Sequence, residues 1–251
     1  MSYNLRRHAA TAELRELVAR HPVDALTLQE GDGVRMPEEI GDLKLASATY
    51  KSELGLAIYY RKDRFTNEKT QTFALKKSLH DRVLTPAHER LIGTRLIDRV
   101  EDRELVVASF HAAPLTAMNS LRRNQIRTAH EELNLLGPGL PTLMVGDYNY
   151  PIFKRNLGNK INKSGYDLTL SDSRTYTRYK FFRGHFDLAT STGLTIDNVE
   201  TLPQRTSDHM PILVTSTYTD ESVHDTVRQS ERRTVREFER SGSPVPEDFD
   251  I

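Results

Sequence analysis

The stretch LMVGDYNYPI at 143–152 puts an acid and an amide two residues apart, directly after an apolar run. Asp147 could activate a water by taking its proton, while Asn149 holds that water or a phosphate oxygen. Asp and Asn are also common in turns, because their short side chains bond the nearby backbone. These two residues alone therefore leave a catalytic turn and a structural turn both open.

Six more polar side chains fall where apolar runs end, and they are Asn4, Glu30, His111, Asp187, Asp208 and His209. Each has a simpler interpretation: a turn cap for Asn4 and for the Ser-Asp-His run at 207–209, a surface acid for Glu30, a structural role for a lone histidine. Polar groups at strand ends can, however, converge at one edge of a sheet sandwich. The set therefore carries more weight than any one member.

The chemistry that such a set supports is hydrolysis of a phosphate ester. Glu30 and Asp208 are hard oxygen ligands of the kind that suits Mg²⁺, which binds through few protein carboxylates and keeps waters. As a phosphodiester is cleaved, charge accumulates on the phosphoryl oxygens, and a metal, an imidazolium and amide N–H groups offset it. A histidine in this role needs an orienting acid, and Asp187 is the expected partner of His209.

Hydrophobic periodicity predicts the elements that must position these residues. Helical spacing of Leu14, Leu17 and Val18 predicts a helix over about 9–20, and a second helix is expected over 118–136. Strands are expected at 23–30, 43–50, 54–61, 142–149, 185–191 and 210–216, with a hairpin of 90–100 and 103–113. Between 149 and 185 we expect a polar region rich in Asn and Lys. Many strands adjoin without a helix between them, which favours a two-sheet core with outer helices.

The ordered motifs "YN", "LQE", "SFHAAP", "VGDYN", "FDLATS" and "SDHMPI" resemble the endonuclease/exonuclease/phosphatase superfamily, the deoxyribonuclease I-like hydrolases. The resemblance covers about residues 1–217, and its Gly-Asp-aromatic-Asn and terminal Ser-Asp-His-x-Pro motifs are characteristic of the family. It implies a four-layered α/β sandwich, in which two packed mixed β-sheets are flanked by helices and the site lies at one end. It also implies divalent-metal-dependent attack of water on a phosphate ester.

The resemblance implies a role for each motif residue. Glu30 matches the main metal-binding glutamate of the family, Asn4 helps to shape that site, and Asp208 matches a metal-associated aspartate. Asp147 and Asn149 match the pair that activates water and positions the phosphate. The implied cofactor is Mg²⁺, with Mn²⁺ as a substitute.

Two histidines complete the implied site. His209 matches the histidine that contacts the scissile phosphate, and Asp187 the aspartate that supports it. His111 resembles the form seen in deoxyribonuclease I and sphingomyelinases, whereas abasic-site endonucleases usually carry a tyrosine nearby; "NLR" at 4–6 in place of Asn-x-Asp also disfavours abasic-site cleavage. Glu53 is our candidate for the acidic partner of His111, with a plain surface acid as the alternative.

Two departures from the family pattern stand out. Tyr148 replaces the common phenylalanine, which is a mild change for a packed ring. The family has a full apolar strand before the motif asparagine, and here only three residues precede Asn4. We expect either a short central strand or a start upstream.

The composition narrows the class of protein. The chain has 35 Lys+Arg and 35 Asp+Glu, so its formal net charge is zero. Residues 218–251 contain five Arg and nine acids, a net charge of 5 − 9 = −4, so residues 1–217 carry a net charge of +4. The absence of cysteine excludes disulfides, cysteine-ligated zinc and thiol nucleophiles. No apolar stretch reaches membrane-spanning length, and the N-terminus lacks an apolar signal core. We expect a cytoplasmic monomer without a membrane span.

These observations predict a catalytic domain over 1–217 and a charged tail over 218–251 that is partly helical and ends in disorder. The predicted function is Mg²⁺-dependent phosphodiester hydrolysis, with DNA or RNA as the favoured substrate. The alternatives are a phosphatase or phospholipase for inositol phosphates or sphingomyelin, which share the catalytic set, and a non-catalytic binding module. Several cations are expected to bind the substrate, and each could equally be a solvated surface charge. They are Arg6, Arg122 and Arg178, then Arg7, Arg123, Lys180 and Arg183.

Overall fold

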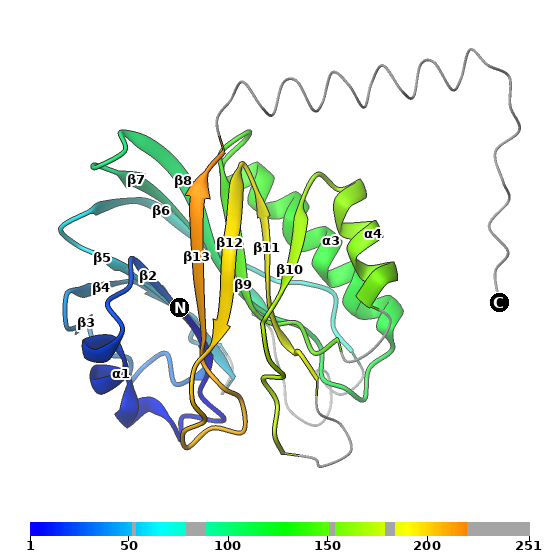
Figure 1. Ribbon diagram of the computed structural model, residues 1–251, viewed down its shortest axis with the longest axis horizontal. Coiled ribbons are helices and arrows are strands. Elements are labelled where there is room, and N and C mark those ends of the chain that lie inside the picture. The colour runs from blue at the N-terminus through cyan, green and yellow to red at the C-terminus, as the bar shows by residue number, and fades with distance from the viewer. Residues whose placement is uncertain (52–53, 79–88, 151–153, 179–183, 220–251) are drawn as a thin grey trace, which may run out of the picture. The chain divides into compact units, whose positions relative to one another are not determined.

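The structure is a computed structural model that describes residues 1–51, 54–78, 89–150, 154–178 and 184–219, and two mixed β-sheets form its centre (Figure 1). The first sheet has seven strands in the order β12 (Leu194–Thr201), β13 (Ile212–Tyr218), β1 (Ser2–Asn4), β2 (Ala25–Gly31), β5 (Gly55–Arg61), β4 (Leu43–Ala48) and β3 (Glu39–Ile40). Among these, β1 and β2 run parallel, so their carboxyl ends meet at one edge. The central strand β1 is only three residues long.

The second sheet has six strands in the order β10 (Asp167–Leu170), β11 (Asp187–Thr192), β9 (Thr142–Asp147), β8 (Arg103–His111), β7 (Leu91–Asp98) and β6 (Phe65–Phe73). Here β8 and β9 are parallel, while β7 and β8 form the antiparallel hairpin expected from the sequence. Each sheet thus carries one parallel pair of strands that end at the same edge.

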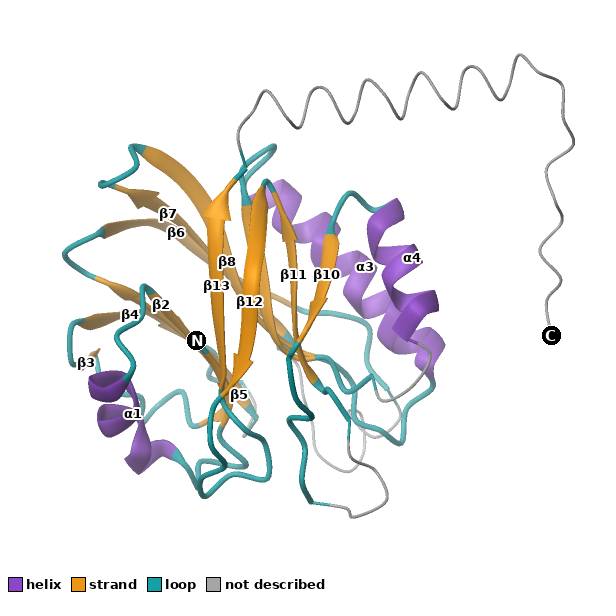
Figure 2. Cartoon of the chain, in the orientation of Figure 1, coloured by secondary structure: helices purple, strands orange, loops and turns teal. Residues whose placement is uncertain are grey.

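Helices cover the outer faces of both sheets (Figure 2). A 3₁₀ turn (Thr11–Glu13) and α1 (Leu14–Arg20) pack on the first sheet, where Leu14 and Leu17 belong to the same hydrophobic core as Leu26 and Leu28 of β2. The helices α3 (Asn119–Leu136) and α4 (Lys154–Lys163) pack on the second sheet. Helix, sheet, sheet and helix make the four-layered α/β sandwich. No helix in the described part of the chain is long and apolar enough to span a membrane.

The interface between the sheets becomes polar toward the strand ends. Gln29 is fully buried, and its Nε2 donates to Ser109 Oγ at 2.9 Å and to Ser2 Oγ at 3.2 Å. Ser109 Oγ in turn donates to the carbonyl oxygen of Leu28 at 2.9 Å. Because Glu30 and His111 each lie within two residues of this network, it holds the ends of β2 and β8 in one relative position.

Most elements lie where hydrophobic periodicity predicted them, with ends shifted by a few residues. Between 149 and 185, where only a polar region was expected, α4 and β10 were missed. Within the described side chains of α4, only Leu157 and Ile161 are buried, so its apolar stripe is too narrow to stand out in the sequence. The strands β6 and β12 were also missed, because most of their side chains are polar and exposed or half-exposed.

Candidate active site

Three of the predicted residues lie side by side at the edge of the second sheet. The register pairs His111 of β8 with Asp147 of β9, and pairs Asp147 with Asp187 of β11. Residues opposite one another on adjacent strands point to the same face of a sheet. The parallel ends of β8 and β9, together with the start of antiparallel β11, therefore present an imidazole and two carboxylates in one row.

The first sheet adds Asn4 and Glu30 from the ends of β1 and β2. Asn4 Nδ2 donates to Asp147 Oδ2 at 3.1 Å, which joins the two sheets across the site. Asn4 Oδ1 accepts the Arg6 N–H at 3.0 Å, and Glu30 Oε2 accepts the Arg7 N–H at 3.0 Å. Glu30 has a φ of 55°, and Asn149 a φ of 47°. Non-glycine residues rarely take this left-handed conformation, so both side chains are aimed by backbone that costs free energy to hold.

Asp147 lies at the centre of the group and is buried. Its Oδ1 accepts the backbone N–H of Asn149 at 2.9 Å, and its Oδ2 accepts the Asn149 side-chain amide at 3.2 Å. Burial is the main cause that raises the pKa of Asp147, to about 7; Asp187 and Glu30 add to the rise, while His209 and the Asn149 N–H oppose it. A carboxyl group with such a pKa can accept a proton near neutral pH.

His209 is paired with Asp187, as the sequence predicted. Its Nδ1 lies 2.9 Å from Asp187 Oδ2, and its Nε2 faces Asp147 Oδ2 at 3.6 Å. Burial lowers the pKa of His209, but the carboxylates of Asp187 and Asp147 outweigh burial and raise it to about 10. His209 is therefore an imidazolium at neutral pH, with Nδ1–H on Asp187 and Nε2–H turned toward Asp147.

His111 carries the opposite charge state. Burial, then the positive charges of Arg90 and His209, hold its pKa well below its usual range, so the ring is neutral. Its Nε2 lies 3.6 Å from Asp147 Oδ2 and 3.8 Å from Glu30 Oε1. Its predicted partner Glu53 lies outside the described residues. Within them, the acids that face the His111 ring are Glu30 and Asp147.

Asp208 lies at the rim of the site beside two arginines. Arg6 Nε is 3.8 Å from its Oδ1, and Arg178 Nη1 is 3.9 Å from its Oδ2. Both arginine side chains are about half exposed, so these long ion pairs contribute little to stability. The two guanidinium groups instead put positive charge at the mouth of the site, where the sequence placed substrate-gripping cations.

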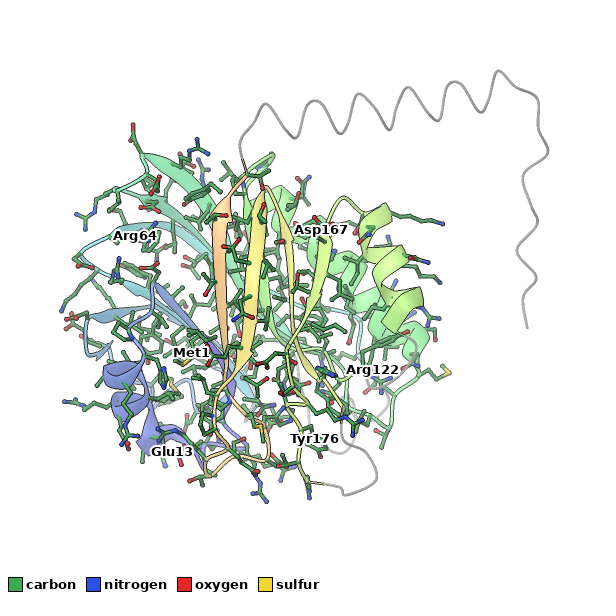
Figure 3. The ribbon with its side chains drawn as sticks, in the orientation of Figure 1. Met1, Glu13, Arg64, Arg122, Asp167 and Tyr176 are labelled. Atoms are coloured by element: carbon green, nitrogen blue, oxygen red, sulfur yellow. The ribbon has the colours of Figure 1, made fainter. Side chains whose placement is uncertain are left out.

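Arg122 is buried behind the site, near enough to Asp147 for a charge interaction, and this burial argues against the prediction that it contacts the substrate. Its side chain is buried at the start of α3 (Figure 3). The guanidinium donates to the carbonyl oxygens of Ala113 at 3.1 Å and Pro114 at 2.8 Å, and to Asn119 Oδ1 at 2.7 Å. A group committed to these acceptors fixes the loop that follows His111. The cations predicted at Lys180 and Arg183 lie outside the described residues.

Several residues of the site were not predicted. Arg90 Nη1 donates to the carbonyl oxygens of His111 at 2.9 Å and Ala112 at 2.8 Å, and nothing in the local sequence marks it. Ser207 Oγ donates to the Asn4 carbonyl oxygen at 2.7 Å and accepts the His209 N–H at 3.1 Å. Its position in the Ser-Asp-His motif could have identified Ser207 from the sequence. The ring of Tyr176, near the lower edge in Figure 3, lies 4.8 Å from the His209 ring.

The cluster could hold a metal ion. Asp147, Asp187 and His209 each offer one ligand atom, and these atoms lie within 4.8 Å of one another. Asp187 Oδ1 is a buried carboxylate oxygen without a hydrogen-bond partner in the described structure. Buried carboxylate oxygens normally have a partner, so this atom leaves room for a cation or a water.

Comparisons with known proteins agree with the motifs and the fold. The sequence model described as Endonuclease/Exonuclease/phosphatase family matches residues 1–209. A comparison with the curated proteins gave no match.

Solved structures with this fold come from proteins of differing activity. A mannosyl-6-phosphatase from Bacteroides thetaiotaomicron is 17% identical, with a TM-score of 0.68 over 86% of this chain and 98% of its own. A D. rerio TDP2 structure with a single-strand DNA product is 14% identical, with a TM-score of 0.67 over 86% and 97%. The human Nocturnin catalytic domain with bound sulfate is 15% identical, with a TM-score of 0.63 over 85% and 86%. At these identities the likeness shows a shared fold.

Proposed function

Because the chain belongs to the endonuclease/exonuclease/phosphatase family, we propose that it is a divalent-metal-dependent phosphodiesterase that cleaves nucleic acid. The observation that carries the proposal is the environment of Asp147. One buried carboxylate is held by Asn4 and Asn149 and lies 3.6 Å from each of two histidines of opposite charge state. This arrangement joins a proton acceptor to a cation that can stabilise a phosphoryl oxygen.

Asp147 is the proposed general base. A pKa of about 7 lets it stay largely ionised at pH 8 and take the proton of an attacking water. The Asn149 N–H and the Asn4 amide orient its two oxygens, so the base does not have to reorganise when the proton moves. Asn149, on backbone held at positive φ, is the proposed second contact for the water or for a phosphoryl oxygen.

The two histidines act differently in this proposal. His209 is charged, and its Nε2–H offsets the negative charge that develops on a phosphoryl oxygen, while Asp187 fixes the tautomer and stabilises the charge. His111 is neutral and contributes a hydrogen bond to the phosphate or to the leaving oxygen. The rigid loop behind it, held by Arg90 and Arg122, keeps its ring in place.

The donors present fit a divalent cation. Glu30 and Asp187 lie close enough to Asp147 to raise its pKa. A bound cation would offset this repulsion between negative charges. We assign Mg²⁺, with Mn²⁺ as a substitute, to Glu30, with Asn4 and Asp208 nearby, which leaves Asp147 as the base. His209 Nδ1 is already committed to Asp187. When bound, the ion would stabilise charge on the phosphoryl group and acidify a water.

A nucleic-acid substrate is supported by the charges at the mouth of the site. Arg6 and Arg178 lie on either side of Asp208 and stay about half exposed, which suits phosphates that flank the scissile one. The solved structures with the same fold do not indicate which substrate this chain cleaves, because one is a sugar phosphatase and another is bound to single-strand DNA. A phosphatase or phospholipase with the same catalytic set is therefore the competing proposal.

An activity screen separates these proposals. The purified protein is assayed with Mg²⁺ on plasmid DNA, single-stranded DNA, RNA, an inositol phosphate and sphingomyelin. Asp147→Asn, purified in parallel, reports any contaminating nuclease. We expect cleavage of DNA or RNA that the variant lacks. Faster turnover on the inositol phosphate or on sphingomyelin supports the competing proposal, and no turnover on any substrate supports a binding module.

A further inference from the structure

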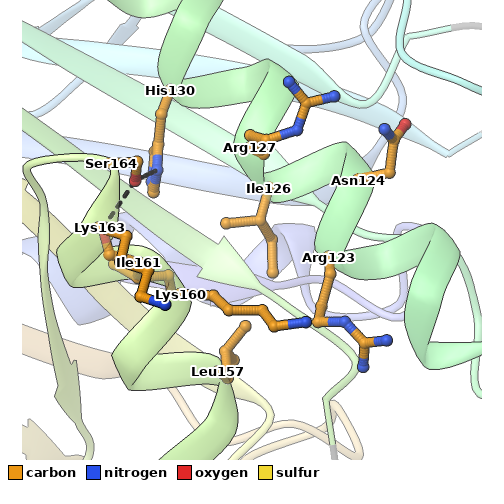
Figure 4. A pocket seen from close by; sticks show the side chains of 10 residues that line it. All are labelled: Arg123, Asn124, Ile126, Arg127, His130, Leu157, Lys160, Ile161, Lys163 and Ser164. Carbon is orange, nitrogen blue, oxygen red and sulfur yellow. Dashed lines mark hydrogen bonds between the residues drawn. The ribbon is translucent and has the colours of Figure 1, made fainter. Parts of the chain in front are cut away.

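A cavity of about 420 Å³ lies between α3 and α4, on the outer side of the second sheet (Figure 4). None of its lining residues belongs to the active-site group of Asn4, Glu30, His111, Asp147, Asn149, Asp187, Asp208 and His209, which we call the Asp147 cluster. The cavity is therefore separate from the site described above. Its volume lies in the range of sites that bind small molecules or parts of larger ligands. We call it the α3–α4 groove.

The walls of the α3–α4 groove are basic. Arg123 and Arg127 come from α3, and Lys160 and Lys163 come from α4, while no lining residue is acidic (Figure 4). Arg127, Lys160 and Lys163 are exposed. Arg127 forms an ion pair with Glu131, which offsets part of one charge. Cations gathered on two facing helices favour a ligand with more than one negative charge.

The floor of the groove is apolar. Ile126, Leu157 and Ile161 are at most 2% exposed as residues and line its base. Behind them, His130 stacks on Tyr166 with ring centroids 3.8 Å apart, and its Nε2 is hydrogen bonded to Thr190 at 3.0 Å. Burial lowers the pKa of His130 to about 3, so the floor is neutral. A ligand that fits has an apolar body and anionic groups at its edges.

One end of the groove is tied to the catalytic turn. Arg123 Nη1 donates to Tyr150 Oη at 3.1 Å, and Tyr150 directly follows Asn149. From Arg123 the groove follows α3 to His130, seven residues further, which corresponds to about 10 Å of helix. At roughly 3.4 Å per nucleotide along a strand, that length accommodates about three nucleotides.

We propose that the α3–α4 groove is an exosite for nucleic acid that binds the phosphates of a strand a few nucleotides beyond the scissile bond. The inference rests on the proposed function, since it names how the same substrate is held outside the cluster. The cations contact successive phosphates, and the apolar floor contacts sugars and base edges. Strand length, rather than the chemistry of the cleaved bond, determines how much this groove contributes.

The test removes two charges at the far end of the groove. Lys160→Gln/Lys163→Gln is compared with Lys44→Gln/Lys69→Gln, which removes two exposed lysines from β4 and β6. Affinity is measured by fluorescence anisotropy in EDTA for single-stranded oligonucleotides of about 4 and about 16 nucleotides. Adenosine monophosphate competes in a parallel arm. Hydrolysis of bis(p-nitrophenyl) phosphate in Mg²⁺ is recorded for every protein, which tests the proposed function separately.

The exosite predicts a length-dependent loss. Each lysine should account for about two- to fivefold in affinity for the long strand and much less for the short one, and the slope of affinity against salt should decrease. The control pair should match the wild type. Equal long-strand affinity in both double variants would overturn the exosite, even if hydrolysis is intact. Equal losses for the short strand, or full competition by adenosine monophosphate, would overturn it in favour of a mononucleotide pocket. Absent hydrolysis with length-dependent loss would refute the enzyme proposal alone.

Discussion

Replacing Asp147 with asparagine should lower activity and, at high pH, raise stability. The carboxyl group is buried, and its pKa rises from 3.8 to about 7 on folding. A raised pKa means that the folded chain binds this proton more tightly than the unfolded chain does. The contribution of the group is therefore most favourable below pH 3.8 and is lost as the pH rises to 7. Asparagine stays neutral throughout, so it escapes this loss.

The size of the pKa shift of Asp147 determines how much the free energy of unfolding should change with pH. From 3.8 to about 7, the loss in the wild type reaches ~4 kcal/mol at pH 8, and roughly 2 kcal/mol of it is already present at pH 5. Asparagine also weakens contacts to Asn4 and Asn149, at a cost of ~1–3 kcal/mol that hardly varies with pH. The variant should therefore gain ~2–3 kcal/mol relative to the wild type between pH 5 and pH 8. Its turnover should fall by ~10²–10⁴-fold.

Urea unfolding in EDTA at pH 5 and pH 8 measures this difference. Asp98→Asn is a matched control of opposite sign, because Asp98 is buried with Arg64 and its pKa is lowered, by the Arg64 hydrogen bond and neighbouring N–H groups despite burial. That variant should lose about the same stability at pH 5 as at pH 8, and less only below pH 3.8, where the carboxyl group of the unfolded chain binds a proton. If the stability difference between Asp147→Asn and the wild type is the same at both pH values, Asp147 has an ordinary pKa and the proposed base is refuted.

Three more predictions concern single side chains. His209→Ala and His111→Ala should each lower turnover at least about a hundredfold in a steady-state assay, and near-wild-type turnover of either would make that histidine structural. Arg122→Met should lower the free energy of unfolding by ~2–4 kcal/mol in urea, because it leaves the Ala113 and Pro114 carbonyl oxygens unpaired; an unchanged value would contradict the buried contacts. Burial lowers the pKa of His130 from 6.5 in the unfolded chain to about 3 in the folded chain. Below about pH 6 the unfolded chain therefore binds a proton that the folded chain does not, and the free energy of unfolding should fall by ~1.4 kcal/mol per pH unit. His130→Gln should show a weaker acid loss, and an identical pH profile would refute that assignment.

Four of the site residues could be found from sequence because each lies at the end of a strand. Asn4, Glu30, His111 and Asp147 end two parallel pairs, and such ends meet at one edge whatever the loops do. Their charge states could not be found this way. Neutral His111 and charged His209 differ because Arg90 lies against one and Asp187 against the other, and those contacts join segments far apart in the chain.

The sequence contained a signal that Arg122 is buried, but its charge led us to expect a surface position. Arg122 precedes Ile126, Ala129 and Leu133 by four, seven and eleven residues, which puts it on the buried face of α3. An arginine that is buried on such a face needs hydrogen-bond acceptors, and the carbonyl oxygens of a nearby loop can supply them. The narrow stripe of α4 offered no such pattern, since two apolar residues one turn apart also occur in loops.

The central claim is metal-dependent cleavage of a phosphodiester at the Asp147 cluster. The most direct measurement is the cleavage rate of a labelled oligonucleotide as Mg²⁺ is titrated into metal-free protein, for the wild type, Glu30→Gln and the control Lys44→Gln. We predict no cleavage in EDTA, full recovery with Mg²⁺ or Mn²⁺, and at least about a tenfold higher Mg²⁺ requirement for Glu30→Gln, because an anionic ligand is lost while the shape is kept. Full cleavage in excess EDTA, or no cleavage at any Mg²⁺ concentration, would contradict it.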